Sequence, residues 1–256
     1  MSKNFDLLQN LGKEDLLSST PENDQKAVTA QGSLPAQVQA ASAEPASVEP
    51  GLEEVAALAQ QIFVTSGSDA PRSVVFTSTE TGTGCTWVSA HLGPILAGRV
   101  AGSVCLVDAN FHEPGLHQRF GIENINGISD ALVKLDPIRT FARSLIPPNL
   151  WLIPSGSAAR GGQALLASDR MRLRIGELRS EFDFVLIDTP AMVLGNEAVR
   201  LGSISDGVVL VLQANASRRN VARQAIRDMQ GGGVKVLGAV LNRRTFPIPD
   251  AIYKIL

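Results

Sequence analysis

Residues 73–87, SVVFTSTETGTGCTW, constrain the fold of this chain more than any other segment. Residues 74–76 form a short apolar run that is typical of a buried strand, residues 77–84 predict a loop, and a helix is predicted over residues 86–98. A strand, a small-residue loop and a helix in this order are typical of phosphate-binding loops, in which backbone N–H groups and the helix N-terminus surround the phosphates.

The loop keeps most of the pattern G-x-x-x-x-G-K-[ST] but lacks its lysine. Gly84 stands at the second glycine and Thr86 at the hydroxyl that binds Mg²⁺. Thr79 replaces the first glycine, and Cys85 replaces the lysine. One charge-assisted contact contributes about 1.5–3 kcal/mol, so we expect nucleotide binding to be roughly tenfold to hundredfold weaker without it. The nucleotide-binding residues predicted from the loop are Thr81, Gly82, Thr83, Gly84, Cys85 and Thr86.

Two further apolar runs end in aspartate. VCLVDAN places Asp108 at the end of one predicted strand, and FVLIDTP places Asp188 at the end of another. An aspartate in such a turn is more often a cap. Beside a phosphate loop, however, strand-end aspartates bind Mg²⁺ directly or through water. We therefore predict that Thr86, Asp108 and Asp188 form a magnesium-linked set.

The order of the remaining elements predicts the fold class. Continuous apolar strands that alternate with helices indicate a parallel sheet with helices on both faces and ligands at the carboxyl ends of the strands. We therefore predict an α/β, P-loop NTPase-like, doubly wound and mainly parallel sheet. The further strands are expected at residues 104–107, 150–153, 184–187, 208–212 and 234–241, and the main helices at 52–63, 169–181 and 217–230.

Composition divides the chain of 256 residues into two parts. Residues 1–51 predict a short helix followed by a flexible linker, because residues 18–51 are rich in Ala, Ser, Pro, Gln and Glu and have no apolar periodicity. Residues 52–256 predict one α/β domain. The formal net charge of −2 does not favour nucleic-acid binding, and no apolar run of 18 residues predicts a membrane span. We expect a cytoplasmic protein.

Several motifs in order over residues 52–241 resemble the cytoplasmic domain of bacterial tyrosine autokinases of capsule and exopolysaccharide synthesis, which belong to the deviant P-loop group with partition and division-site ATPases. The resemblance implies ATP or ADP and Mg²⁺ as cofactors, Asp108 and Asp188 as catalytic acids, and Asn242 as an adenine-reading amide. It also implies a membrane polysaccharide co-polymerase or chain-length regulator as partner, which would recruit the chain to the inner membrane face. The motifs are TSTETGTGCT, CLVDANFHEPGLHQRFGI, GISDAL, LWLIPSG, FDFVLIDTPA, DGVVLVLQA and LGAVLN.

The departures from this family fall at functional positions. The second acid of the second motif is Asn110, and the family's tail of several tyrosines is reduced to Tyr253. Tyr253 is either the single phospho-acceptor or a residue that packs the C-terminus, and we favour packing. The other departures are His112 and Glu113 in place of a basic pair, Glu80 in place of the partition ATPases' signature lysine, and Ala56 and Ala59 in place of two oligomer-contact arginines.

Three functions agree with these observations. We favour a regulator of exopolysaccharide assembly with weak or lost kinase activity. An active tyrosine autokinase would need a substitute cation, for which Arg218, Arg219, Arg243 and Arg244 are candidates. A partition-type positioning ATPase is disfavoured by Glu80. Cys85 is either a reactive thiolate at a helix N-terminus or a neutral filler, and the sequence does not determine an oligomeric state.

Overall fold

A computed structural model describes residues 51–65, 70–157 and 162–244. The predicted N-terminal linker and Tyr253 lie outside the described residues. The described part contains a seven-stranded sheet in the order β3-β4-β2-β5-β1-β6-β7, in which only the edge strand β3 runs antiparallel to its neighbour. The strands are β1 (Ser73–Ser78), β2 (Val104–Asp108), β3 (Arg143–Ser144), β4 (Leu150–Ile153), β5 (Phe184–Asp188), β6 (Gly207–Gln213) and β7 (Val236–Asn242).

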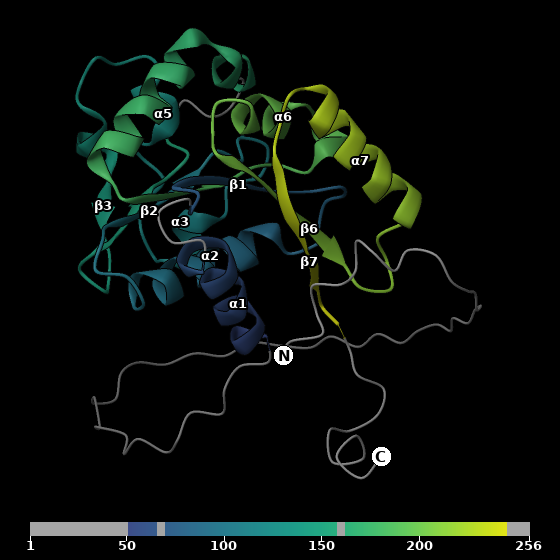
Figure 1. Ribbon diagram of the computed structural model, residues 1–256. Helices are drawn as coiled ribbons and strands as arrows, with labels where there is room; N and C mark the ends of the chain where they lie inside the picture. The colour runs from purple at the N-terminus through teal and green to yellow at the C-terminus, as the bar shows by residue number, and fades with distance from the viewer. Residues whose placement is uncertain (1–50, 66–69, 158–161, 245–256) are drawn as a thin grey trace, which may run out of the picture. The chain divides into compact units, whose positions relative to one another are not determined.

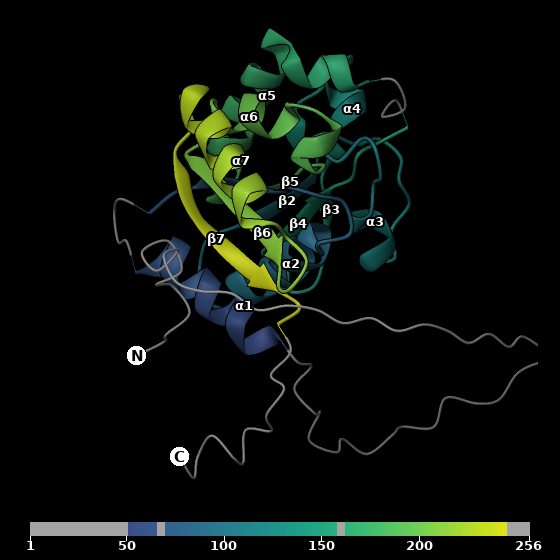
Figure 2. The same cartoon turned by 90° about the vertical axis from the view of Figure 1, so that its right-hand side faces the viewer.

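Helices cover both faces of the sheet, as Figures 1 and 2 show. One face carries α1 (Leu52–Ala59) and α2 (Cys85–Ala97), and α1 continues into the π-helical segment η2 (Gln60–Val64). The other face carries α5 (Asp169–Glu181), α6 (Glu197–Gly202) and α7 (Arg219–Gly231). The short elements between them are α3 (Leu116–Arg119), α4 (Ile128–Ala131), and the 3₁₀ helices η4 (Ile138–Phe141), η5 (Gln163–Ala167) and η6 (Met192–Leu194).

The central strand β1 explains why the sheet is buried on both sides. Val75 packs into the core under α5, α6 and α7, whereas Val74 and Phe76 pack into the core under α1 and α2. All three side chains are fully buried. Because successive residues of a strand point to opposite faces, a continuous apolar run is what a doubly covered sheet requires. The predicted fold class is confirmed.

The strand order places the loop after β1 at the centre of one edge of the sheet. β1 pairs with β5 on one side and with β6 on the other, and all three strands run parallel. In the register of β2 and β5, Asp108 lies opposite Asp188. The carboxyl ends of β1, β2 and β5 therefore meet at the point where ligands bind in open α/β sheets.

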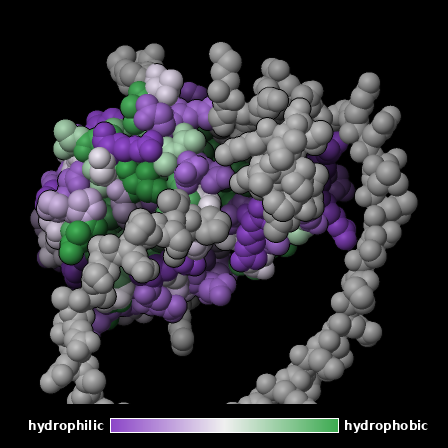
Figure 3. All heavy atoms as spheres, turned by 90° about the horizontal axis from the view of Figure 1, so that it is seen from below, coloured by the Kyte–Doolittle hydropathy of each residue, from purple (hydrophilic) through white to green (hydrophobic). Residues whose placement is uncertain are grey.

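The hydropathy of the described surface is mixed. Hydrophilic and hydrophobic residues are interspersed on the face seen in Figure 3. Among the described residues, no helix has the length and apolar character needed to cross a membrane.

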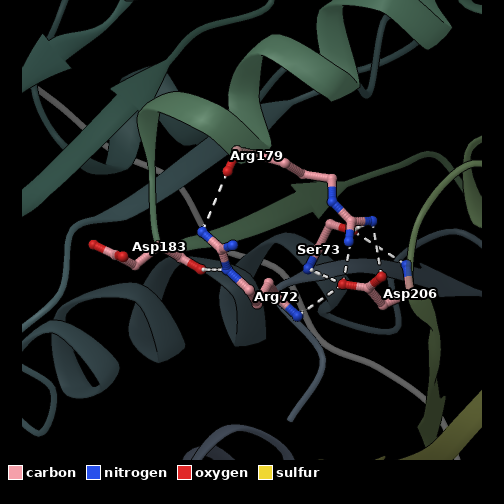
Figure 4. A network of polar contacts seen from close by, with 5 residues as sticks. All are labelled: Arg72, Ser73, Arg179, Asp183 and Asp206. Atoms are coloured by element: carbon pink, nitrogen blue, oxygen red, sulfur yellow. Dashed lines mark hydrogen bonds and ion pairs between the residues drawn. The ribbon is translucent and has the colours of Figure 1, made fainter. Parts of the chain in front are cut away.

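A polar network holds the opposite end of the sheet (Figure 4). Asp206 accepts hydrogen bonds from the backbone N–H groups of Arg72 and Ser73, each at 2.8 Å, and from Arg179 Nη1 at 2.8 Å. Arg72 Nε donates to the Asp183 carbonyl oxygen at 2.9 Å. Burial by itself would raise the pKa of Asp206, but the hydrogen bonds from Ser73 and Arg72 and the charge of Arg179 outweigh it, and the pKa lies below its usual value.

We predict that Asp206→Asn lowers the free energy of unfolding at neutral pH by about 1–2 kcal/mol, because a charged acceptor of several hydrogen bonds is lost from a partly exposed site. A carboxylate with a lowered folded-state pKa stabilises the fold above its unfolded pKa of about 3.9, and this contribution disappears as the pH falls through the folded pKa. The difference between wild type and Asp206→Asn should thus be constant above about pH 5 and shrink as the pH falls from about 5 to about 2. Urea unfolding across this range measures it. Asp136→Asn, on an exposed residue, is the control, and an equal loss in both variants would contradict the prediction.

Candidate functional site

The loop between β1 and α2 has the backbone shape of a phosphate cradle. Gly82 and Gly84 have φ angles of +76° and +88°, in the left-handed region that favours glycine. Val88 N donates the first intrahelical hydrogen bond of α2 to the Gly84 carbonyl at 3.0 Å. The N–H groups of residues 84–87 precede this bond and are available to an anion.

A cavity of about 490 Å³ lies in front of this loop. The predicted nucleotide-binding residues 81–86 all line it. The remaining lining residues come from the ends of β1, β5 and β7, from the start of α2, and from the segment that leads from β2 into α3. They are Ser78, Trp87, Asn110, Glu113, Pro114, Gly115, Gln118, Arg119, Thr189, Ala191, Leu194 and Arg243.

Asp188 joins the loop to the sheet. Thr86 Oγ1 donates to Asp188 Oδ2 at 2.7 Å, and Ser89 Oγ donates to Asp188 Oδ1 at 3.3 Å. Asp188 is fully buried, and burial raises its pKa to about 6 against the opposing hydrogen bonds from Thr86, Cys85 and Ser89 and the charge of Arg119. The structure therefore brings the predicted metal hydroxyl and one predicted acid into direct contact.

Asp108 has a different environment. Its carboxylate accepts hydrogen bonds from the backbone N–H groups of Gly115 and Leu116, each at 3.0 Å, and of Asn110 at 3.2 Å. It is fully buried, and burial together with the negative charge of Asp188 raises its pKa to about 7. These contacts hold the start of α3, and the catalytic, magnesium-linked role of Asp108 stays a prediction.

Cys85 does not have the properties of a reactive thiolate. Its side chain is buried in the core under α2. Burial, and next the negative charge of Asp188, raise the pKa of the thiol well above its ordinary value. The hypothesis of a reactive thiolate at the helix N-terminus was therefore wrong, because burial outweighs the helix dipole at this position.

Asn242 supports the loop from behind. Its Nδ2 donates to the Thr83 carbonyl oxygen at 2.8 Å, and its Oδ1 accepts from the Arg243 backbone N–H at 2.9 Å. A Cβ atom on Gly84 would lie only 2.3 Å from Asn242 Nδ2, so this position admits glycine alone without a shift of the amide. The contact of Asn242 with adenine stays a prediction.

The cavity contains residues that the sequence analysis did not select. Arg119 and Gln118 reach it from α3, and Ser89 reaches Asp188 from the second turn of α2. Among the arginines predicted as substitute cations, Arg243 lines the cavity, whereas its described lining residues do not include Arg218, Arg219 or Arg244. The signal for Arg119 in the sequence was weak, because it follows Asp108 by eleven residues and belongs to a helix of only four.

The site fits a magnesium nucleotide better than a free metal ion. Within the described residues, no group of three or more His, Cys, Asp or Glu side chains could hold a metal ion. Magnesium at P-loops keeps waters and takes phosphate oxygens as ligands, so few protein groups are needed. Thr86 and Asp188 fit this role. A Cβ atom on Gly82 would meet no heavy atom within 4 Å, which leaves room beside the loop for phosphates.

Comparison with known sequences identifies the relatives of this chain. The family model described as "Cellulose biosynthesis protein BcsQ" matches residues 72–230. Tyrosine-protein kinase YwqD of Bacillus subtilis is 29% identical over 171 residues, which cover 67% of this chain and 72% of YwqD. Putative tyrosine-protein kinase EpsB of Ralstonia nicotianae is 29% identical over 195 residues, which cover 76% of this chain and 26% of EpsB. The match thus spans most of YwqD but about a quarter of EpsB.

Solved structures show the same fold. The kinase domain of VpsO has a TM-score of 0.67 and 25% identity, with 75% of this chain and 96% of that chain covered. The septum site-determining protein MinD of Pyrococcus horikoshii, complexed with Mg-ADP, has a TM-score of 0.57 and 22% identity, with 72% of this chain and 77% of that chain covered. The chain therefore belongs to the family described as cellulose biosynthesis protein BcsQ, and within the P-loop proteins it is similar to the bacterial tyrosine kinases.

Proposed function

We propose that this chain binds Mg-ATP or Mg-ADP at the loop after β1 and acts as a cytoplasmic regulator of exopolysaccharide assembly with weak or lost kinase activity. The observation that carries the proposal is the contrast within the loop. The backbone cradle and the contact between Thr86 and Asp188 are complete, whereas the lysine position holds Cys85, whose thiol is buried. The residues needed to bind are present, and the residue that neutralises charge is missing.

This contrast separates binding from phosphoryl transfer. Transfer depends on positioning and on neutralising the charge that spreads over the transferred phosphoryl group. When bound, Mg²⁺ supplies part of that neutralisation. The N–H groups of residues 84–87 orient the phosphates, and Thr86 and Asp188 hold the metal side of the nucleotide. Without the lysine, we expect the loss to be larger in rate than in affinity, because the lysine acts most strongly in the transition state.

An active tyrosine autokinase is the second candidate. The likeness to YwqD and to the kinase domain of VpsO supports it, and Arg243 lines the cavity as a cation. Its predicted phospho-acceptor, Tyr253, lies outside the described residues. A positioning ATPase of the partition type is less favoured, because the likeness to MinD rests on the fold and Glu80 occupies the position of that group's signature lysine.

The proposed partner is a membrane polysaccharide co-polymerase or chain-length regulator that recruits this domain to the inner face of the membrane. The name of the matching family, which refers to cellulose biosynthesis, supports a role in polysaccharide synthesis. The match to EpsB supports a partner. About three quarters of EpsB lies outside the matched part, so the matching domain is joined there to further sequence in the same chain.

Thr86→Ala tests the magnesium-linked hydroxyl. We predict Mg-ADP binding in the micromolar range for the wild type and roughly tenfold weaker binding for the variant, because one ligand of the metal is lost. Calorimetric titration measures both. In EDTA the difference between the two proteins should be much smaller, since only the support that the hydroxyl gives to the loop through Asp188 is then lost. Thr140→Ala, which removes the same atoms from an exposed residue, is the control. No binding by the wild type would overturn the proposed function.

Cys85→Lys tests what the missing charge does. We predict that it tightens Mg-ATP binding by roughly tenfold to hundredfold, because an ammonium group then reaches the terminal phosphates. We also expect ATP turnover to increase by a larger factor than affinity. Cys85→Ser removes the thiol without adding charge and should leave both quantities near the wild-type level. Efficient autophosphorylation by the wild type would instead support the autokinase.

Mg-ADP affinity should depend on the ionisation of Asp188. The pKa of Asp188 is raised to about 6, so the carboxylate that faces Thr86 is mostly protonated at about pH 5 and mostly ionised at about pH 7. We predict that affinity rises by about tenfold across this interval beyond the change due to the nucleotide itself. Asp188→Asn reports the nucleotide's own pH dependence. Equal slopes for the two proteins would show that Asp188 does not serve the metal.

A further inference from the structure

The loop has lost its lysine, and the cavity in front of it shows which group can replace it. Two arginines line the cavity, Arg119 from α3 and Arg243 from the end of β7. We propose that Arg119 binds the nucleotide phosphates from α3 and supplies the positive charge that Cys85 does not. This inference rests on the proposed function, because it names the cation of the same site.

The position of Arg119 is fixed by buried contacts. Asp108 Oδ2 accepts hydrogen bonds from the N–H groups of Gly115 and Leu116, which lie at the start of α3. Leu116 is fully buried in the core under α2. Arg119 N then donates to the Gly115 carbonyl at 3.4 Å, one turn further on. The guanidinium is therefore carried on a backbone that the buried strand-end aspartate holds in place.

The same contacts place α3 beside the metal-binding residues. A Cβ atom on Gly115 would lie 3.1 Å from Thr86 Cγ2, so the first turn of α3 packs against the residue that carries the metal hydroxyl. Arg119 ends this short helix and lines the same cavity as Thr86.

The charge of Arg119 is not neutralised by an ion pair among the described residues, unlike that of several other arginines. Arg139, Arg174 and Arg179 form ion pairs with Glu181, Glu177 and Asp206. Among the described residues, no carboxylate forms an ion pair with Arg119, whose side chain is exposed at the cavity. A guanidinium offers five N–H donors in a planar fork that matches phosphate oxygens. Because Arg119 is exposed, salt should screen its charge more strongly than it would screen the charge of a lysine within the loop.

Arg243 is the weaker candidate for this role. It follows the end of β7, and its backbone N–H donates to the side chain of Asn242, the residue that contacts the loop at Thr83. Arg119, in contrast, belongs to α3, whose start packs against Thr86. Arg119 therefore suits the phosphates next to the metal.

The test combines Arg119→Gln with Cys85→Lys and measures Mg-ATP, Mg-ADP and adenosine binding by calorimetry. Arg119→Gln should weaken Mg-ATP binding by roughly tenfold at about 0.1 M salt and by less at about 0.5 M salt, and should leave adenosine binding unchanged. Arg119→Lys should keep part of the affinity. In the double variant Cys85→Lys and Arg119→Gln, Mg-ATP binding should return to at least the wild-type level, because the loop lysine makes Arg119 dispensable.

Arg172→Gln is the matched control, because it removes the same charge from an exposed position of α5 on the other face of the sheet. Thermal melting confirms that each variant is folded. Equal Mg-ATP affinity in wild type and Arg119→Gln would overturn the role of Arg119 and leave the proposed nucleotide site standing. Equal losses for Mg-ATP and adenosine would also overturn it, since they would indicate a change in the cavity and not a lost phosphate contact. Absence of nucleotide binding by the wild type would overturn both.

Discussion

The hydrogen bond between Thr86 and Asp188 is the contact on which the rest of the site depends. It joins the first turn of α2 to the end of β5 across 2.7 Å, and its acceptor Asp188 is fully buried. A buried carboxylate without such donors would be strongly destabilised. The hydroxyls that satisfy it therefore fix the loop against the sheet, and Asn242 fixes it from the other side through Thr83. The loop keeps its shape through these neutral contacts, which is why it can lose its lysine and remain a cradle.

The two buried aspartates lie in register and perform separate tasks. Asp108 satisfies three backbone N–H groups and organises the segment that leads into α3, whereas Asp188 faces side-chain hydroxyls. Burial raises the pKa of both, and the charge of Asp188 raises that of Asp108 further. Two adjacent carboxylates in such an environment ionise at an electrostatic cost that a nearby cation reduces. In this chain Arg119 provides such a charge, and Mg²⁺ would provide a larger one.

The sheet was predictable from the sequence because buried parallel strands leave continuous apolar runs, and β2, β4 and β5 begin at the predicted residues. The prediction of secondary structure failed for elements too short to show an apolar period. β3 has two residues and α3 has four, and neither was predicted. The residues of the loop were found because their spacing is a local pattern. Arg119 was not found, because its role follows from the path of the chain after Asp108. Of the two hypotheses for Cys85, burial favours the neutral filler over the reactive thiolate, and the depth of burial was not readable from the local sequence.

Placing the cation on α3 changes how the site can work. A lysine in the loop moves with the loop and is always beside the phosphates. Arg119 lies on a separate element that is held to the loop through Asp108, Gly115 and the packing against Thr86. A partner that displaced α3 would therefore remove the charge of Arg119 without disturbing the phosphate cradle. A partner that pressed α3 toward the loop would strengthen nucleotide binding. The affinity for nucleotide would then depend on the position of α3, whereas a lysine in the loop keeps its charge beside the phosphates.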